Sequence, residues 1–553
     1  LEAGIQLDGR QRINTLTGGY TIGRPVDIDG SRLTAGDRYG FDITDPAIPT
    51  TDDTRISGLA FYGFNEDAPL TGGNGGAGIR LNDISSDVYI TDNYFGLRSN
   101  GRSSRNENGI VIGKYDGGGL MTISGNTIVR SSGAGILIDP VLAGEAVVGD
   151  PAGTVEDVTI SNNLIGTNLR RRNYRNNDGI VLDGTGGSGV DPAVTADDTF
   201  NISLVTIQDN MIAYSSNNGI TVRGSNDVVL QDNVLTLNRA NGIAIGDDDG
   251  DAYSSDVSVI GNDITRSGTN GVYVGNGSAG IDIGTTADEE GNRIGTNSSG
   301  RRGLGNRANG VFVEGAGADV SLAGNLIMSN GARRTTAGRS GIKLSNQSDS
   351  VVITENNISM NRDAGIEAET AGTKATITKN TIFRNYGSGI KLTDTAFADL
   401  VVGALAPTGV SPTDQGNTIL SNRRYGVDLS AGAATVGGNV MLGNRRGGID
   451  SQVTKPTISS ATLNTDDLTV TLSAVPANGD VIHFYLGTGR RSRSQGYRYI
   501  GSITGDGVLD TFTLNNLDAD LRVRVGSSLT ATTTPVAGGG VSEFSGNVSI
   551  RRP

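Results

Sequence analysis

The 553-residue chain contains no cysteine and no tryptophan, and it has only one histidine. Without cysteine, the chain has no disulfides and no thiolate metal sites. Aromatic residues make up only 5% of the chain, a composition that argues against thick globular cores. No apolar run approaches the roughly 18 residues of a membrane-spanning helix, so we expect no membrane insertion.

Basic residues are fewer than acidic residues, and the net charge is -14. Nucleic-acid-binding proteins usually present excess positive charge to phosphates, so this balance argues against a nucleic-acid partner. Glycine, in contrast, is abundant, with 84 residues. Such a glycine content favours many tight turns around a thin aliphatic core.

One sequence pattern returns along most of the chain. The stretch ITKNTIFRNYGSGIKL (377–392) has counterparts in ISGNTIVRSSGAGILI from Ile123, LQDNVLTLNRANGIAI from Leu230 and VIGNDITRSGTNGVYV from Val259. Each unit has an asparagine between two β-branched runs, then a polar turn, then glycine before isoleucine or valine. Repeats let a chain of this length form one stacked structure, because each unit contacts only its neighbours.

The spacing of the central asparagines predicts the fold. The shortest spacings are 22 residues, from Asn417 to Asn439, and 23 residues, from Asn210 to Asn233. A period in the low twenties with short strands is typical of a parallel β-helix, with longer spacings produced by loops inserted at a turn. The predicted asparagine ladder consists of Asn93, Asn126, Asn163, Asn210, Asn233, Asn262, Asn292, Asn325, Asn356, Asn380, Asn417 and Asn439.

Each residue type of the repeat has a physical role. An asparagine amide at a bend donates and accepts hydrogen bonds along a stack of coils, so we interpret these residues as structural. Ile390 and Leu392 alternate with Lys391 and are expected to point inward. Gly389 and the equivalent glycines are expected to provide a positive φ at the opposite corner.

The pattern changes near residue 453. Seven short alternating runs follow, separated by turn residues, from KPTISSATL (455–463) to GNVSI (546–550). This pattern predicts a compact β-sandwich. The predicted fold is all-β, with a cap or strand-exchange segment over 1–19, a parallel β-helix over 20–452 and an Ig-like sandwich over 453–553.

Two coils carry a more specific resemblance. NLIGTNLRRRNYRNNDGIVL (163–182) and GNRIGTNSSGRRGLGNRANGVFV (291–313) resemble secreted bacterial right-handed parallel β-helix proteins of the carbohydrate-binding and sugar-hydrolase repeat class. The tail LTATTTPVAGGGVSEFSGNVSI (529–550) resembles the sandwich domain that follows such helices. The resemblance implies an extracellular or cell-surface setting, but it leaves the activity open because one fold serves many functions.

An acidic turn is the candidate metal site. Asp247, Asp249 and Asp251 surround Gly250 and would offer carboxylate oxygens to Ca²⁺, which takes six to eight such ligands. The alternative is a solvated loop, and we expect no other cofactor. If the chain is an enzyme, Arg266 with Asp249 is its candidate catalytic pair.

Arginine recurs in nearly every coil between the asparagine and the glycine. Because equivalent turns stack, these side chains would form a basic ridge that docks an acidic polysaccharide or an acidic face of an identical subunit. In the alternative, each arginine pairs with a nearby carboxylate. The candidate docking residues are Arg171, Arg172, Arg301, Arg302, Arg333, Arg334, Arg423, Arg424, Arg445 and Arg446.

Three functional hypotheses follow. The first is a self-associating structural rod, in a surface or matrix filament or as an adhesin, in which GIQLDG (4–9) adds as a strand to a neighbour's open edge. The second is a polysaccharide lyase or epimerase acting on an acidic glycan. The third is a glycan-binding module without turnover. His483, the only histidine, lies in an alternating strand and is interpreted as a core or strand-face residue.

Overall fold

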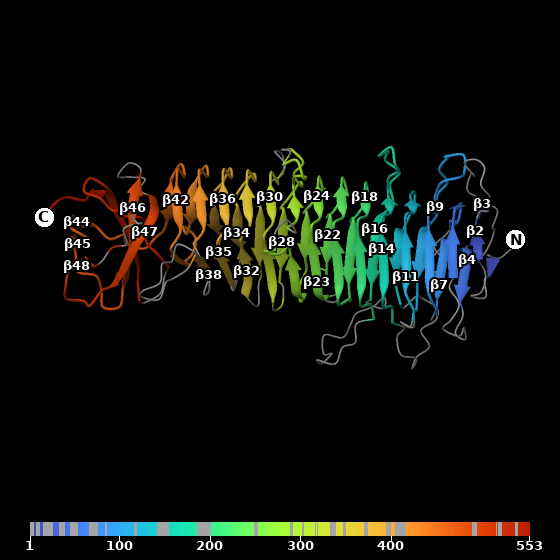
Figure 1. Cartoon of the computed structure of the whole chain (residues 1–553), viewed down its shortest axis with the longest axis horizontal. Helices are drawn as coiled ribbons and strands as arrows, with labels where there is room; N and C mark the ends of the chain where they lie inside the picture. The colour runs from blue at the N-terminus through green and yellow to red at the C-terminus, as the bar shows by residue number, and fades with distance from the viewer. Residues whose placement is uncertain are drawn as a thin grey trace. The chain divides into compact units, whose positions relative to one another are not determined.

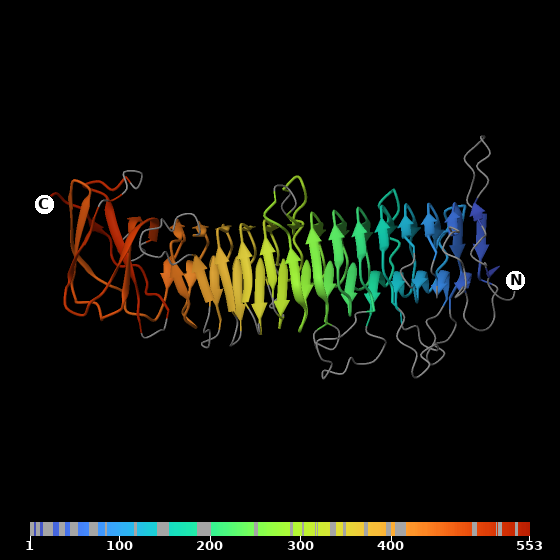
Figure 2. The ribbon, with the colours of Figure 1, turned by 60° about the horizontal axis from the view of Figure 1, so that its bottom comes forward.

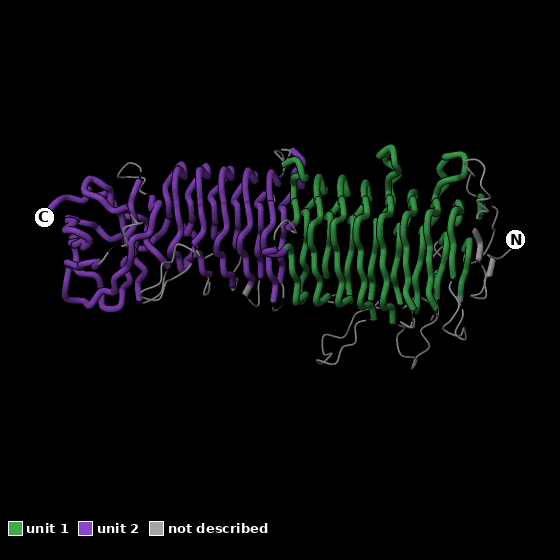
Figure 3. The backbone as a smooth tube through the Cα atoms, viewed as in Figure 1, with its two compact units in different colours: residues 1–284, 292–301 green, residues 285–291, 302–553 purple. Residues whose placement is uncertain are grey.

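In the computed structural model, the described residues belong to strands, turns and loops, and none of them forms a helix. The chain divides into two compact units (Figure 3): unit 1 comprises residues 1–284 and 292–301, and unit 2 comprises residues 285–291 and 302–553. The described residues are 5–6, 12–14, 26–31, 39–44, 54–65, 76–82, 84, 86–115, 119–140, 154–184, 201–247, 253–287, 291–300, 303–315, 317, 319–331, 339–346, 350–369, 374–393, 400–403, 416–488, 495–515, 517, 522–536 and 540–553.

Unit 1 is built from coils of three strands, one in each of three parallel sheets (Figure 1). The first sheet holds β1 (Ile5–Gln6), β4 (Tyr39–Thr44), β7 (Ala77–Asn82), β10 (Asn108–Ile112), β13 (Ala134–Ile138), β16 (Asp178–Asp183), β19 (Ile220–Arg223), β22 (Ile243–Ile245) and β25 (Val272–Val274). The second sheet holds β2 (Arg12–Asn14), β5 (Thr54–Ser57), β8 (Val88–Thr91), β11 (Met121–Ser124), β14 (Val158–Ser161), β17 (Val205–Gln208), β20 (Val228–Gln231), β23 (Ser255–Ile260) and β26 (Ala279–Ile283). The third sheet holds β3 (Val26–Asp29), β6 (Leu59–Tyr62), β9 (Tyr94–Phe95), β12 (Thr127–Ile128), β15 (Leu164–Ile165), β18 (Met211–Ala213), β21 (Val234–Thr236), β24 (Asp263–Thr265) and β27 (Arg293–Ile294).

The coils of unit 2 follow the same plan (Figure 2). Its strands of the first sheet are β28 (Val311–Glu314), β31 (Ile342–Ser345), β34 (Ile366–Glu369), β37 (Ile390–Leu392), β40 (Tyr425–Asp428) and β43 (Gly447–Asp450). Those of the second sheet are β29 (Val320–Ala323), β32 (Ser350–Thr354), β35 (Lys374–Thr378), β38 (Leu400–Gly403) and β41 (Thr435–Gly437). Those of the third sheet are β30 (Leu326–Met328), β33 (Asn357–Ser359), β36 (Thr381–Phe383), β39 (Thr418–Leu420) and β42 (Val440–Leu442).

The coil interior is a column of aliphatic side chains. Ile110 pairs with Ile136, which pairs in turn with Ile180 of the next coil, and all three are fully buried. In β37, Ile390 and Leu392 are buried and Lys391 is half-buried, as the period-two pattern predicts. Stacking identical apolar positions removes their surface from water without aromatic residues.

The central asparagines lie in the turn between the second and third sheets. The side-chain amide of Asn380 donates to the side-chain oxygen of Asn417 at 3.0 Å, and its backbone N–H donates to the same oxygen at 3.0 Å. All members of this first ladder are buried. They are Asn93, Asn126, Asn163, Asn210, Asn233, Asn262 and Asn292 in unit 1, and Asn325, Asn356, Asn380, Asn417 and Asn439 in unit 2.

A second ladder lies in the turn between the third and first sheets. In unit 2 it runs through Asn330, Asn361, Asn385, Asn422 and Asn444. The ladder ends on Gln495 of the sandwich, whose side-chain oxygen accepts from the backbone N–H of Asn444 at 2.9 Å. Five residues separate the two asparagines of one coil, for example Asn380 and Asn385.

The expectation of a positive φ at the glycine before isoleucine is wrong. Gly365 and Gly389 are absent from the described residues with positive φ. A Cβ on Gly389 would instead lie 2.5 Å from Cγ2 of Ile419 and 2.6 Å from the carbonyl oxygen of Gly426. Glycine is therefore required at this corner because neighbouring coils and the third sheet approach too closely for a side chain.

The seven alternating runs after residue 453 form two antiparallel sheets within unit 2, as predicted. One sheet has the order β44 (Ile458–Asn464), β45 (Asp467–Leu472) and β48 (Thr511–Leu514), and the other has the order β47 (Gln495–Thr504), β46 (Val481–Thr488), β49 (Ser528–Thr534) and β50 (Val548–Ser549). Their core includes Leu468, Phe484 and Leu529, all fully buried. At the other end of the chain, Ile5 of the GIQLDG segment pairs within its own chain, with Phe41 of β4.

Candidate functional site

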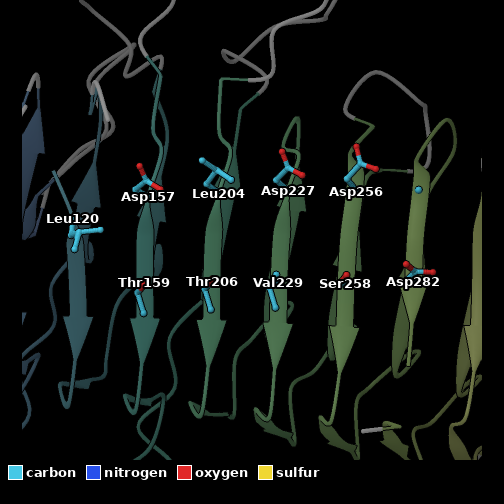
Figure 4. Close-up of a pocket in the computed structure, with 11 residues that line it drawn as sticks. Leu120, Asp157, Thr159, Leu204, Thr206, Asp227, Val229, Asp256, Ser258 and Asp282 are labelled. Atoms are coloured by element: carbon cyan, nitrogen blue, oxygen red, sulfur yellow. The ribbon is translucent and has the colours of Figure 1, made fainter. Parts of the chain in front are cut away.

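The most extensive candidate site is a depression of about 610 Å³ on the outer face of the second sheet of unit 1. We call it the acidic trough (Figure 4). Strands β14, β17, β20, β23 and β26 form its floor. It is lined by Leu120, Asp157, Thr159, Leu204, Thr206, Asp227, Val229, Asp256, Ser258, Gly280 and Asp282.

Strand register places these side chains in two rows (Figure 4). The floor row follows from direct pairing of Thr159 with Thr206, then Val229, Ser258 and Asp282 on successive coils. These residues alternate with buried inward side chains such as Val205 and Val228. The upper row lies two residues earlier in each strand and contains Leu120, Asp157, Leu204, Asp227 and Asp256.

The backbone of the upper row is unusual. Asp157, Asp227 and Asp256 have φ of 57°, 51° and 51°, a left-handed conformation that aspartate tolerates better than most residues. Leu204 adopts it too, with φ 53°, although a leucine pays a strain of order 1 kcal/mol or more there. Its side chain is also 50% exposed. Leu204 is therefore unfavourable at this position for two independent reasons.

The trough offers three kinds of contact. Its carboxylates accept hydrogen bonds, its threonine and serine hydroxyls donate and accept them, and Leu120 and Leu204 present apolar surface at 59% and 50% exposure. The lining contains no lysine or arginine. Because strands are spaced about 4.8 Å apart, equivalent groups repeat along the trough at that interval.

Asp282 differs from the other carboxylates of the trough. Burial raises the pKa of its carboxyl group, and the nearby charge of Asp256 raises it further. Asp256 aligns with Gly280 on the next coil, so the backbone positions of Asp256 and Asp282 lie roughly 8 Å apart, given strand spacing and rise. Inverting glycosidases use two carboxyl groups at about this separation, one of them with a raised pKa.

A second depression, of about 570 Å³, lies in unit 2 along the turn between the third and first sheets. We call it the arginine depression. Its lining includes Arg362, Arg384, Tyr386 and Arg423. Arg423 is one of the predicted docking residues, whereas Arg362 and Arg384 were not among them.

The remaining predicted docking residues are divided between described and masked parts of the chain. Arg171 and Arg172 are exposed in unit 1, and Arg424, Arg445 and Arg446 are exposed in unit 2. Arg301, Arg302, Arg333 and Arg334 lie outside the described residues.

The candidate metal and catalytic residues are also only partly described. Asp247 follows β22, and Arg266 follows β24 with an exposed side chain and φ of 55°. Asp249 and Asp251 lie outside the described residues, so the proposed pair of Arg266 with Asp249 and the calcium site stay predictions. Within the described part of the chain, no three His, Cys, Asp or Glu side chains are grouped to hold a metal ion.

Sequence reasoning missed both the acidic trough and the second asparagine ladder. The ladder had a signal, because asparagine or serine recurs five residues after the first asparagine, as in Asn233 with Asn238 and Asn210 with Ser215. The trough had a weaker one. Its upper-row aspartates precede the second-sheet strands at irregular intervals, and loops separate Asp157 from Asp227.

The fold agrees with a comparison of the sequence with known families. A family model described as a right handed beta helix region matches residues 250–403. These coils form a right-handed parallel β-helix. No curated protein matches the sequence. No helix in the described residues has the length and apolar character needed to cross a membrane.

Solved structures with similar coils come from several kinds of protein. The enzymatically active domain of tailspike protein 2 from bacteriophage CBA120 is 10% identical, with 86% of this chain and 72% of that chain covered and a TM-score of 0.34. The A-module of a mannuronan C-5 epimerase from Azotobacter vinelandii is 14% identical, with 74% and 86% covered and a TM-score of 0.30. A surface protein and adhesin of Streptococcus pneumoniae is 15% identical, with 64% and 85% covered and a TM-score of 0.29.

Proposed function

We propose that the chain is an extracellular glycan-binding protein whose acidic trough holds a polysaccharide. The exposed, left-handed Leu204 within a row of aspartates carries this proposal. Sugar rings have apolar faces and hydroxyl edges, and binding sites for them combine apolar surface with a few placed polar groups. Leu120 and Leu204 supply the apolar surface, and the surrounding carboxylates and hydroxyls supply the polar groups.

The charge of the trough limits its ligand to an uncharged or basic glycan. Asp157, Asp227, Asp256 and Asp282 line it without a basic residue. A polymer of uronic acids would place like charges together, which is unfavourable when they are partly desolvated. The acidic polysaccharide expected from the arginine pattern therefore does not suit this surface.

Binding of soluble β-glucan, mannan and chitosan to the full chain, measured by affinity electrophoresis and calorimetry, tests the proposal. We expect Leu204→Asn and Asp227→Asn each to weaken binding about tenfold, the effect of roughly 1.4 kcal/mol. Leu169→Asn and Asp209→Asn are matched controls, because Leu169 is exposed outside the trough and Asp209 is exposed with φ 55°. Equal weakening in variants and controls would refute a site in the trough.

The same samples report on turnover. If Asp256 and Asp282 cleave the bound glycan, new reducing ends appear and are lost in Asp282→Asn, because the residue with the raised pKa supplies the proton. Binding without new reducing ends assigns the trough to recognition alone.

Self-association is a second candidate function, favoured by opposite charges on one chain. Unit 1 presents the acidic trough and unit 2 presents the arginine depression, so the trough of one copy is complementary to the depression of another. Such heterologous contacts build open chains of subunits. Sedimentation at rising protein concentration should then show growing species at low salt that dissociate at high salt, and a monomer under all conditions would exclude this role.

A further inference from the structure

The arginine depression of unit 2 has a fixed internal arrangement. The guanidinium carbon of Arg423 lies 3.7 Å from the ring centroid of Tyr386, and that of Arg362 lies 4.6 Å from the same centroid. These are cation–π distances. The three residues occupy the same position on successive coils, directly after Asn361, Asn385 and Asn422 of the second ladder.

Backbone hydrogen bonds hold this stack to the ladder. The N–H of Tyr386 donates to the carbonyl of Asn361 at 2.9 Å, and the N–H of Arg423 donates to the carbonyl of Asn385 at 3.0 Å. The side chains therefore start from positions that successive coils fix. A preorganised arginine loses less conformational entropy when it binds a ligand.

The positive charge of the depression is not neutralised locally. Over the described ranges of the chain, no ion pair involves Arg362, Arg384 or Arg423. The nearby carboxyl of Asp363 interacts with Lys391, Arg424 and Arg339 instead. Stacking on Tyr386 uses the face of each guanidinium, so its N–H edge stays available to accept an oxyanion.

Unit 1 contains a comparable depression at the turn between its third and first sheets. It also measures about 570 Å³, and Arg105, Arg130 and Arg175 line it. Arg130 lies over the ring of Tyr174 at 5.9 Å. The Nε atom of Arg175 is buried and has no hydrogen-bond partner. An unsatisfied buried donor costs about 1–3 kcal/mol, which a bound oxygen acceptor would recover.

We propose that both arginine-lined depressions bind the oxyanion groups of an acidic glycan. The same combination, three arginines with a stacked tyrosine, occurs in each unit at the same turn of the coil. Arg362 and Arg423 are two coils apart, about 9.6 Å by strand spacing, so they meet separate charges on one polymer. The net charge of -14 disfavours nucleic acid as the polyanion.

This binding does not depend on the trough, because its ligand has the opposite chemistry. The test uses the full chain with three probes, namely polygalacturonate for carboxylates, dextran sulfate for sulfate esters, and uncharged dextran. We expect Arg362→Gln combined with Arg423→Gln to weaken binding of the preferred anionic polymer by roughly 100-fold, about tenfold for each lost charged hydrogen bond. Uncharged dextran should not bind this surface.

A charge-matched control separates a site from general attraction. Arg551→Gln with Arg552→Gln removes the same two charges from exposed positions at the C-terminal end, and we expect less than a twofold effect. Equal weakening in the two double variants, failure of both anionic polymers to bind, or equal binding of duplex DNA would each overturn the proposal. Binding of only one anionic polymer supports the site and identifies its oxyanion.

Two further variants keep the result interpretable. Arg423→Lys retains the charge but loses the planar stack, and an affinity between those of wild type and Arg423→Gln supports stacked recognition. Asp227→Asn alters the trough and should leave polygalacturonate binding undiminished. A loss of neutral-glycan binding alone therefore reports on the trough, and a loss of anionic-glycan binding alone reports on the arginine sites.

Discussion

The coils and the sandwich of unit 2 bury polar side chains in opposite ways. Asn380 in the coils is fully buried, and its amide donates to the carbonyls of Ile353 and Thr378 at 2.8 Å as well as to Asn417. His483 on β46 of the sandwich is 4% exposed, and both of its ring nitrogens lack a hydrogen-bond partner. Only the coil supplies partners for the polar group that it buries.

This difference follows from repetition. Each coil presents the same asparagine, so every buried amide meets an identical amide above and below it, and each hydrogen bond strengthens its neighbours. The sandwich has no repeat, and the buried imidazole is tolerated because it stays uncharged. A polar group in a repeated position therefore stabilises the fold, whereas a polar group in a unique position needs its own partner.

Breaking the ladder should have the largest effect. Asn380→Ala removes the acceptor of the Asn356 backbone N–H, which donates to Asn380 at 2.9 Å, and of the Asn356 amide at 3.0 Å. Because unsatisfied buried groups cost about 1–3 kcal/mol each, we expect the free energy of unfolding to fall by about 3 kcal/mol. Urea unfolding followed by far-UV circular dichroism measures this loss.

The control for this prediction is an asparagine outside the ladders. Asn478→Ala changes an exposed turn of the sandwich and should shift the unfolding free energy by less than about 0.5 kcal/mol. If Asn380→Ala costs no more than Asn478→Ala, the ladder is a consequence of coil stacking and does not stabilise it.

The sequence is sufficient to predict the fold because the fold depends on repeated positions. The 22-residue spacing of Asn417 and Asn439 reflects one turn of the coil, and the alternation around Ile390 reflects its inward face. The role of Gly389 was misjudged, since close approach of the next coil becomes visible only when three sheets are packed together.

The candidate sites were harder to predict because they lie on outward positions, where the repeat imposes no residue type. Asp227 and Asp256 lie on adjacent coils but 29 residues apart in the chain, and a loop of variable length separates most such pairs. The arginine pattern was visible, but the stack of Arg362 and Arg423 on Tyr386 depends on coil register, which fixes who meets whom.

The sandwich histidine should show a smaller effect, confined to acidic pH. Burial lowers the pKa of His483 from 6.5 to about 4, so the folded state binds a proton less readily than the unfolded state. Its contribution to stability is therefore fully present above pH 6.5 and is lost as the pH falls toward 4. We expect His483→Leu to remove a pH-dependent loss of about 2 kcal/mol between pH 7 and pH 5, since each pH unit in this window is worth about 1.4 kcal/mol.

Urea unfolding of wild type and His483→Leu at both pH values measures this difference, and the shared carboxylates cancel when the two proteins are compared. Proton NMR gives an independent check, because the chain has a single histidine and its ring resonance reports one titration. A midpoint near 6.5 would mean that water or a partner reaches the ring, and the contrast with the asparagine ladder would fail. A midpoint near 4, with a flat pH response in His483→Leu, would show that the sandwich keeps its buried polar group only by keeping it neutral.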